Sequence, residues 1–141
     1  MEYNAQQLAK MAIEARKLSY SPYSHFAVGA ALMAKDGRIF SGGNIENAAY
    51  SVCNCAERTA LFKAVSEGAK EFVAIAVSGG ADTLQQGDDL PLCTPCGVCR
   101  QALYEFAGPD LPVILAKGKG EYEETTLGGL LPKGFGPKDL E

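Results

Sequence analysis

Four of the five cysteines lie in two short segments, and their spacing could support metal chemistry or thiol redox chemistry. CNCAER (53–58) contains two thiols followed by a glutamate and an arginine, and PCGVCR (95–100) contains two thiols three residues apart. Both segments fall where a helix is predicted to begin, and unpaired N–H groups and the helix dipole there favour a thiolate. Cys96 and Cys99, at i and i+3, would share one helix face and could bind one ion. A protein-bound zinc needs at least three such ligands, and Cys55 is available from the other helix start.

Three other interpretations of the cysteines are open. A disulfide framework is disfavoured, because the number of cysteines is odd and cytosolic thiols are normally reduced. A thioredoxin-like redox pair in PCGVC (95–99) would not require the cysteine–glutamate pair elsewhere in the chain. Cys53 or Cys93 could add a fourth thiolate and close a structural zinc site. The single histidine, His25, is far from both clusters in sequence.

Glu57 and Arg58 each have a functional and a purely structural interpretation. The Glu57 carboxylate, two residues after Cys55, could exchange protons with a zinc-bound water, or it could simply stabilise the helix dipole. Arg58 is either a solvated helix charge or a donor to the thiolates. Three thiolates around Zn²⁺ leave a net negative site, and a guanidinium bonded to a thiolate would offset that charge. Helix geometry alone pairs Glu57 with Cys53, at i and i+4, at least as well as with Cys55.

Length and composition restrict the class of protein. The 141 residues suit one domain spanning 1–141, and 47% hydrophobic with 21% charged residues is typical of a soluble globular protein. A net charge of −4 argues against a nucleic-acid partner, which would need clustered Lys and Arg. No basic start precedes an apolar run, and no stretch approaches the roughly 18 apolar residues of a membrane span. We therefore expect a cytoplasmic protein that contacts neither nucleic acid nor membrane.

The first half of the chain predicts a helix and a hairpin. Over residues 5–18 the apolar positions recur at helical spacing, with Arg16 among the polar positions between them. FAVGAALMA (26–34) is apolar on both faces and predicts a strand buried on both sides. KDG (35–37) turns the chain, and the returning strand begins at RIFSG (38–42).

The second half predicts alternating helices and strands. One helix starts near Cys55 and stops at Gly68, and a second starts with Thr94 as N-cap and Pro95 in its first turn. The polar loop 80–94 is long enough to be functional or mobile. The expected strands, two buried and then one exposed, cover residues 72–79, 112–117 and 120–126. Strand, helix and strand in succession imply a parallel βαβ unit, so we expect an α/β fold: a three-layer α/β/α sandwich with a mixed five-stranded sheet.

The sequence resembles the cytidine deaminase family. CAER (55–58) with PCGVCRQ (95–101) is similar to the zinc deaminase signature, a ligand-x-Glu followed by Pro-Cys-x-x-Cys. SPYSHFAVGAAL (21–32), GGNIENAAY (42–50) and LLPKGF (130–135) narrow the resemblance to cytidine deaminases. It covers nearly the whole chain, and with cysteine as first ligand it is closest to the small homotetrameric type.

The resemblance implies a full set of site residues. Cys55, Cys96 and Cys99 match the ligands of one Zn²⁺ per subunit, Glu57 matches the proton shuttle, and Arg58 matches an arginine that neutralises the thiolates. The implied substrate contacts are Phe26 near the base, Asn44 and Glu46 at the ribose hydroxyls, the Ala56 N–H at the base carbonyl, and Tyr50 and Phe135 from a neighbouring subunit. Without the resemblance, the asparagines of NIEN (44–47) would indicate only a turn.

The implied activity is hydrolytic deamination of the free nucleosides cytidine and 2′-deoxycytidine to uridine and 2′-deoxyuridine, in pyrimidine salvage. One alternative within the enzyme class is deamination of a cytosine-containing antibiotic nucleoside, as in the related blasticidin deaminases. NIENAAY (44–50) argues against it, because this segment resembles the ribose-binding version. The alternative from another class is a structural zinc module without chemistry.

Overall fold

The structure is a computed structural model that describes residues 2–141. One mixed sheet has the strand order β2-β1-β3-β4-β5. The strands are β1 (Phe26–Ala34), β2 (Ile39–Gly43), β3 (Phe72–Ala81), β4 (Pro112–Gly118) and β5 (Glu121–Thr126). Neighbouring strands are antiparallel except β3 and β4, which run parallel. The fold class expected from the sequence is therefore confirmed.

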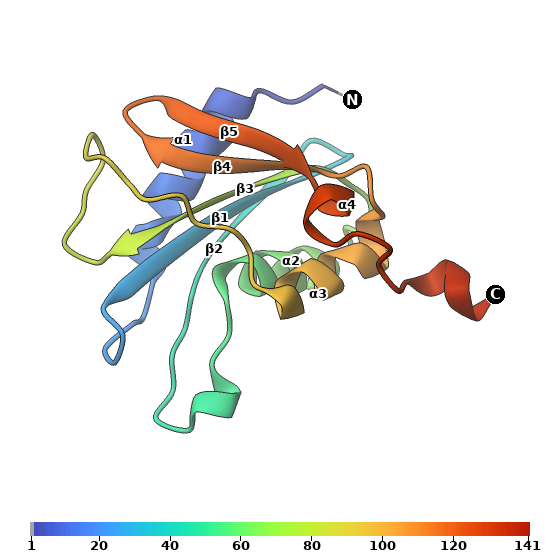
Figure 1. The fold of residues 1–141 in the computed structure, drawn as a ribbon, viewed down its shortest axis with the longest axis horizontal. Helices are drawn as coiled ribbons and strands as arrows, with labels where there is room; N and C mark the ends of the chain where they lie inside the picture. The colour runs from blue at the N-terminus through green and yellow to red at the C-terminus, as the bar shows by residue number, and fades with distance from the viewer. Residues whose placement is uncertain (1) are drawn as a thin grey trace.

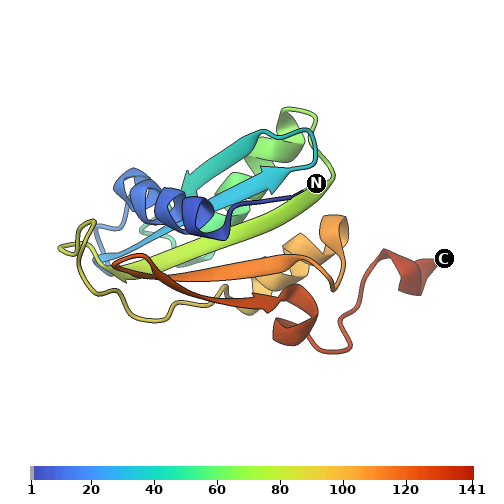
Figure 2. The same cartoon turned by 90° about the horizontal axis from the view of Figure 1, so that it is seen from above.

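Helices cover both faces of the sheet. Helix α1 (Ala5–Ala15) packs on one face, whereas α2 (Ala56–Ser66) and α3 (Gly97–Ala107) pack on the other (Figures 1 and 2). The shorter elements are the 3₁₀ turns η1 (Arg16–Leu18), η2 (Tyr50–Val52) and η3 (Pro137–Leu140), and the one-turn helix α4 (Leu127–Leu130). Helix α3 connects the two parallel strands, as the predicted βαβ unit requires.

Strand β3 shows why the sequence has apolar runs without alternation. Its even-numbered residues Ala74 and Ala76 pack toward α1, while Ile75 and Val77 pack toward α2 and α3, and all four are fully buried. Successive side chains of a strand point to opposite faces, and both faces are covered here. Burial of a side chain the size of Ile75 stabilises the fold by about 1.5–3 kcal/mol.

The first helix differs from the prediction at its end. Helix α1 stops at Ala15 and continues as η1, and Arg16 is only 6% exposed rather than a surface residue. Its position explains the burial, because Arg16 follows Ile13 by three residues and Ala12 by four, and both are buried. Helical spacing therefore carries Arg16 onto the core side of the turn.

The start of the third helix was also predicted wrongly. Helix α3 begins at Gly97 with Cys96 in the N-cap position, so Thr94 and Pro95 precede the helix instead of capping it. Cys96 has an extended backbone (φ −67°, ψ 166°), which keeps the chain out of the helix until the following residue. The connecting loop also starts later than expected, because β3 continues to Ala81 by pairing with Phe26.

Two glycines let α1 and η1 lie unusually close to the sheet. A Cβ atom on Gly29 would lie 2.2 Å from the Ala12 carbonyl oxygen and 2.5 Å from the Arg16 nitrogen. A Cβ atom on Gly43 would lie 2.6 Å from the Leu18 carbonyl carbon. These distances are far below van der Waals contact, so any larger residue would push the helix away.

Strand β5 forms one edge of the sheet and is mostly exposed, as predicted. Its charged residues are Glu121, Glu123 and Glu124. The Lys117 ammonium lies 3.2 Å from the Glu123 carboxylate, and the Tyr3 hydroxyl donates a hydrogen bond to Glu124. This edge is therefore acidic and polar.

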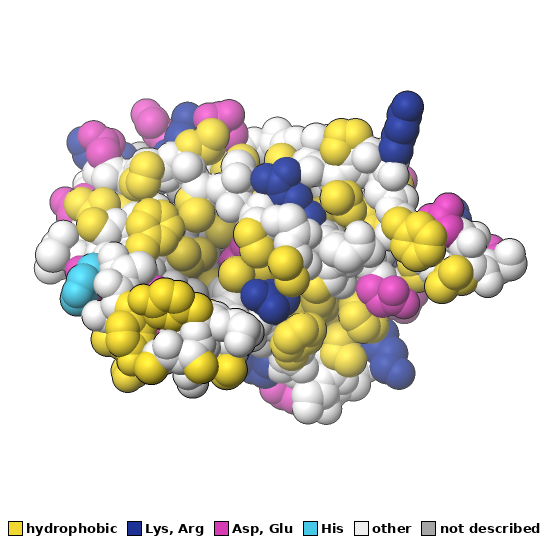
Figure 3. All heavy atoms as spheres, turned by 60° about the horizontal axis from the view of Figure 1, so that its bottom comes forward, with side chains coloured by type: hydrophobic (Ala, Val, Ile, Leu, Met, Phe, Trp, Pro, Cys, Tyr) yellow, Lys and Arg dark blue, Asp and Glu magenta, His cyan; other side chains and the backbone are white. Residues whose placement is uncertain are grey.

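Exposed hydrophobic side chains gather on the face seen in Figure 3, where the loops 19–25 and 44–55 lie. The exposed fractions are 47–74% for Tyr20, Tyr23, Ile45, Tyr50 and Val52. Beyond α4 the C-terminal tail extends away from the body in Figures 1 and 2, with Phe135 at 58% exposure. Within the described chain, none of the helices is both long and apolar enough to cross a bilayer.

Candidate metal centre and active site

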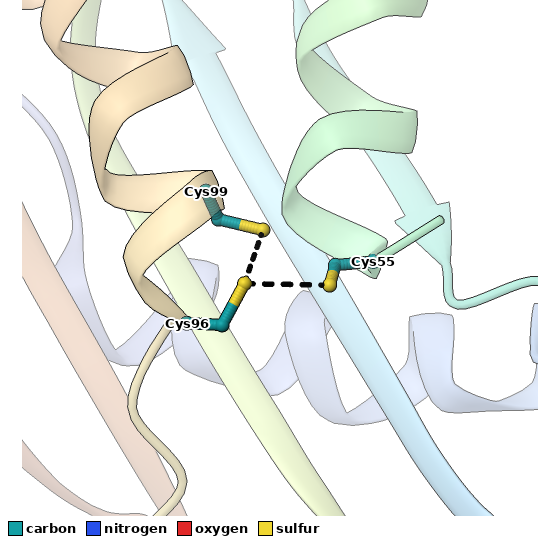
Figure 4. A group of neighbouring side chains, drawn as sticks. All are labelled: Cys55, Cys96 and Cys99. Carbon is teal, nitrogen blue, oxygen red and sulfur yellow. Dashed lines mark hydrogen bonds between the residues drawn. The ribbon is translucent and has the colours of Figure 1, made fainter. Parts of the chain in front are cut away.

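Three thiols from two helix starts meet at one point. The Cys55 sulfur lies 3.6 Å from that of Cys96, and the Cys96 sulfur lies 3.4 Å from that of Cys99. The three sulfurs all lie within 4.8 Å of one another, and Figure 4 shows them turned toward a common centre. All three are free cysteines, so the disulfide interpretation does not describe this structure. Their spacing suits ligation of one thiophilic ion.

The helix starts hold two of these thiols in equivalent positions. Cys55 is the N-cap residue of α2 and Cys96 is the N-cap residue of α3, and neither side chain makes a capping hydrogen bond. Cys99 lies one turn further along α3 and is buried. Each helix therefore directs the positive end of its dipole toward the cluster, which favours thiolates there.

The thiols of the cluster share protons unequally. Hydrogen bonds from Cys99, Arg58 and Cys96 lower the pKa of Cys55 to about 5, although burial opposes this shift. The bond with Cys55 raises the pKa of Cys99. Arg58 Nη2 lies 3.4 Å from Cys55 Sγ, and this bond raises the pKa of the guanidinium. Arg58 is thus a donor to the Cys55 sulfur rather than a solvated charge.

The remaining cysteines and the histidine lie outside the cluster. Cys53 Sγ accepts a hydrogen bond from Asn47 N at 3.2 Å, which closes the loop before α2. Burial raises the pKa of Cys93 to about 11, so this thiol is neutral near pH 7. His25 Nδ1 lies 3.1 Å from Asp82 Oδ2. None of these groups joins the three clustered thiols, and a closed four-cysteine site is not formed among residues 2–141.

Glu57 is buried beside the thiols. Its side chain is 3% exposed, and its Oε1 atom has no hydrogen-bond partner. Burial raises the pKa of Glu57 to about 7, and the nearby Cys55 adds to this shift. An unpartnered buried carboxyl oxygen is costly unless the site supplies a partner when it works. A carboxyl that titrates near neutrality can both accept and donate protons.

One cavity of about 390 Å³ connects the thiols to the predicted substrate residues, and its lining includes Phe26, Asn44, Glu46, Cys55, Glu57 and Cys96. Two larger hollows, of about 530 and 820 Å³, surround the start of α1. Neither of them is lined by a thiol or by a buried carboxylate. The chemistry therefore points to the smaller cavity.

Asn44 and Glu46 line this cavity, and both side chains already make hydrogen bonds to neighbouring segments of the protein. Asn44 Oδ1 accepts from Ser19 Oγ at 2.5 Å and from Val28 N at 2.9 Å, and Asn44 Nδ2 donates to the Phe26 carbonyl at 2.9 Å. Only one amide hydrogen of Asn44 is left for a ligand.

The Glu46 carboxylate accepts hydrogen bonds from the backbone of Tyr23 at 3.0 Å and of Ser24 at 3.1 Å, and from the Ser24 hydroxyl. The hydroxyl bond is the main reason that the pKa of Glu46 is lowered. The carboxylate therefore remains an acceptor with free lone pairs near neutral pH.

Phe26 and Ala56 lie where a planar ring could be held. Phe26 is the first residue of β1, and its ring edge packs over Gly79, where a Cβ atom would come within 3.0 Å of it. Ala56 is the first residue of α2, so its N–H has no acceptor within the helix. Tyr50 and Phe135 do not line the cavity of their own chain.

Several contacts of the site were missed by sequence reasoning. They are the Cys53–Asn47 bond, the Ser19–Asn44 bond, the loop amides on Glu46, and the buried Arg16. The turn residues of SPYS (21–24) gave a signal for a loop but not for its partner. For Arg16, the spacing from Ala12 and Ile13 was the available signal.

Comparisons with known proteins agree with this geometry. A family model described as "Cytidine and deoxycytidylate deaminase zinc-binding region" matches residues 2–115. A cytidine deaminase from Sporosarcina psychrophila is 54% identical over 127 residues, which cover 90% of this chain and 88% of that protein. The crystal structure of cytidine deaminase from Burkholderia pseudomallei superimposes with a TM-score of 0.82 at 44% identity, covering 94% of this chain and 100% of that one.

A blasticidin-S deaminase from Bacillus cereus is also similar, with 32% identity over 126 residues that cover 89% of this chain and 88% of that protein. This chain is therefore related to both kinds of deaminase that the sequence suggested, and it is more similar in sequence to the cytidine deaminase above.

Proposed function

Because this chain belongs to the cytidine and deoxycytidylate deaminase family and is an enzyme of the hydrolytic deaminase class, we propose that its substrates are cytidine and 2′-deoxycytidine. The products are uridine or 2′-deoxyuridine and ammonia, and the reaction serves pyrimidine salvage. The observation that carries the proposal is the cluster of three thiols next to the unpartnered carboxyl oxygen of Glu57, at a cavity that Cys55, Cys96 and Glu57 line.

We propose that Cys55, Cys96 and Cys99 hold one zinc ion per subunit. Three sulfur donors without a fourth side chain suit a catalytic rather than a structural zinc site. When bound, zinc would supply a Lewis acid that polarises a water molecule and lowers its pKa toward neutrality. Arg58, through its bond to Cys55, offsets part of the negative charge of the three thiolates.

Glu57 is the proposed proton carrier. Its carboxylate takes a proton from the attacking water and delivers it to N3 of the cytosine ring, which makes C4 more electrophilic. A C–O bond then forms at C4, and the C4–N bond breaks as Glu57 passes the second proton to the departing amine. A pKa of about 7 suits a group that must take up and release protons near neutral pH.

The cavity walls support the proposed nucleoside contacts. Phe26 would pack against the base, and the Ala56 N–H would donate to the base carbonyl. The free amide hydrogen of Asn44 and the remaining lone pairs of Glu46 would bind the ribose hydroxyls. Because other contacts already fix both side chains, little conformational entropy is lost when a sugar binds.

We also propose a homotetramer in which Tyr50 and Phe135 complete the pocket of a neighbouring subunit. The supporting observations are the exposed aromatic loops of Figure 3 and the extended tail that carries Phe135. A patch of this kind commonly marks a protein interface. Sedimentation of the active enzyme as a monomer would contradict the shared pocket.

The direct test of the function is the ultraviolet absorbance change when purified zinc-loaded protein is mixed with cytidine. We expect turnover that disappears after treatment with a chelator and returns on addition of zinc. Blasticidin S in the same assay decides between the two related activities, since faster turnover of that compound than of cytidine would reverse the assignment. A zinc-loaded protein that leaves both compounds unchanged would instead indicate a structural zinc module.

A further inference from the structure

Arg16 is a buried cation on the opposite side of the sheet from the thiols. Its guanidinium donates to four backbone carbonyls: Nε to Ala27 at 3.0 Å, Nη1 to Leu84 at 3.0 Å, and Nη2 to Gly80 at 3.3 Å and Ala81 at 2.7 Å. These carbonyls belong to the start of β1, the end of β3 and the loop that follows it. One side chain thus joins the end of the first helix to the start of β1 and to the continuous segment 80–84, which lies more than 60 residues away in sequence.

The positive charge of Arg16 is stabilised by hydrogen bonds to carbonyl groups and not by a neighbouring carboxylate. Among residues 2–141, no carboxylate oxygen lies within 4.0 Å of the guanidinium. Burial lowers its pKa, while the charges of Asp82 and Asp88 at longer range oppose this shift. A buried charge is costly unless its hydrogen bonds are satisfied. Because the guanidinium is planar and its N–H groups point in fixed directions, it constrains the positions of all four carbonyls.

The position of Arg16 depends on the close approach of η1 to the sheet. Gly29 allows that approach, since any side chain there would collide with the backbone of Ala12 and Arg16. The guanidinium consequently reaches the end of the sheet at which β1 starts and β3 finishes, where Phe26 pairs with Ala81 and Ala27 pairs with Gly80.

The same end of the sheet forms a wall of the cavity on its other face. Phe26 directly precedes Ala27, and Gly79 directly precedes Gly80. A Cβ atom on Gly79 would lie 3.0 Å from the Phe26 ring and 2.6 Å from the Cys93 sulfur, so the ring and the thiol both pack on this glycine. The loop held at Leu84 then continues to Cys93 and to the thiols of α3.

We propose that Arg16 is a positioning residue for the nucleoside pocket. From the opposite face of the sheet it fixes the backbone next to Phe26, which lines the pocket, and the start of the loop that carries Cys93. This inference rests on the proposed function. Loss of the guanidinium would leave the thiols on their helices but would loosen the wall against which the base packs. Substrate binding should therefore suffer more than the chemical step.

The test compares Arg16→Met and Arg16→Lys with a core variant of the same helix. Arg16→Met keeps the length of the side chain but removes every donor, and Arg16→Lys keeps the charge without the planar fork. Leu8→Ala or Leu8→Val, whichever matches the thermal midpoint of Arg16→Met, is the control for stability alone. Leu8 is 1% exposed, packs on the α1 face, and contacts none of the four carbonyl groups through hydrogen bonds.

We expect Arg16→Met to raise KM for cytidine about tenfold, with kcat changed less than about threefold and zinc content equal to that of the parent. Arg16→Lys should lie between the two, and the Leu8 control should leave KM unchanged. Amide exchange over 82–94 should be faster in Arg16→Met than in the control. Equal KM and equal exchange in Arg16→Met and the matched control would overturn the proposal.

Failure of this proposal is distinguishable from failure of the proposed function. A parent protein that does not deaminate cytidine would contradict the function alone, because the exchange measurement needs no substrate. If Arg16→Met does not fold, Arg16→Lys carries the same comparison with the same expected direction.

Discussion

The start of α1 and the starts of α2 and α3 differ in how they satisfy the helix end. At α1, the side chain of the N-cap residue Asn4 accepts a hydrogen bond from Gln7 N at 3.0 Å. At α2 and α3, the N-cap residues Cys55 and Cys96 make no such bond and point at the thiol cluster instead. A good cap stabilises a helix by about 1 kcal/mol. The two site helices therefore give up local stability, and their free N–H groups and dipoles serve the site.

Cys96→Ser should have the largest effect, because it replaces the uncapped start of α3 with a start that serine can cap. Serine is a preferred N-cap but a poor zinc ligand, so we expect bound zinc to fall sharply and turnover to drop below about a thousandth of the parent's. The metal-free variant should be more stable than the metal-free parent by about 0.5–1 kcal/mol. Zinc analysis, the cytidine assay and urea unfolding measure these effects.

Cys53→Ser is the matched control for that variant, since Cys53 contacts Asn47 and lies outside the cluster. It should keep its zinc. Full zinc content in Cys96→Ser, or loss of zinc in Cys53→Ser alone, would show that the ligand set is wrong.

Glu57→Gln tests whether the first turn of α2 carries out proton transfer as well as ligation. We expect turnover of cytidine to fall by about 10²–10⁴, the usual contribution of a positioned acid–base group. Zinc content and fold should be unchanged, because the amide has the same shape. Turnover equal to that of the parent would remove Glu57 from the mechanism.

The same variant should also reveal the stability cost of the site through pH dependence. The pKa of Glu57 is about 7 in the folded protein, compared with an ordinary value of 4.5 in the unfolded chain. The unfolded chain therefore loses this proton first, and the folded state loses stability as the pH rises from about 4.5 to about 7. Chelator-treated Glu57→Gln should therefore be more stable than the chelator-treated parent by on the order of 3 kcal/mol at pH 8. The difference should vanish near pH 4. A difference independent of pH would point to packing instead of charge.

Asn4→Ala produces the smallest expected effect and tests the other side of the comparison. Removal of the cap should lower the free energy of unfolding by about 1 kcal/mol while KM and kcat stay at the parent's values. Chemical denaturation combined with the cytidine assay measures both. A change in KM without a change in stability would mean that the start of α1 contributes to the site.

Features that depend on a short stretch of sequence could be predicted, whereas features that depend on distant segments could not. The thiols of CAER and PCGVC lie at two helix starts that the sequence predicts to within two residues, and the structure brings these thiols together. The cap of α3 was misplaced by two residues, because threonine is a preferred N-cap residue, whereas Cys96 takes that position without making a capping bond. The roles of Tyr50 and Phe135 stay predictions, since they require a second subunit.

Contacts between distant segments could not be predicted from local patterns. Arg16 was assigned to the polar positions because charged residues are rarely buried, and its four carbonyl partners come from strands and a loop that only the fold places there. The bonds from the 21–24 loop to Glu46 are of the same kind. A spacing rule describes one helix or one turn, whereas these bonds depend on the arrangement of the whole sheet.

The acidic edge strand has a consequence for how molecules of this protein meet. Another β5 that docked against it would bring the carboxylates of Glu121, Glu123 and Glu124 against like charges. Repulsion of this kind protects concentrated solutions from sheet-to-sheet polymerisation. In the proposed homotetramer, the contacts between molecules would therefore come from the exposed aromatic loops and not from this edge.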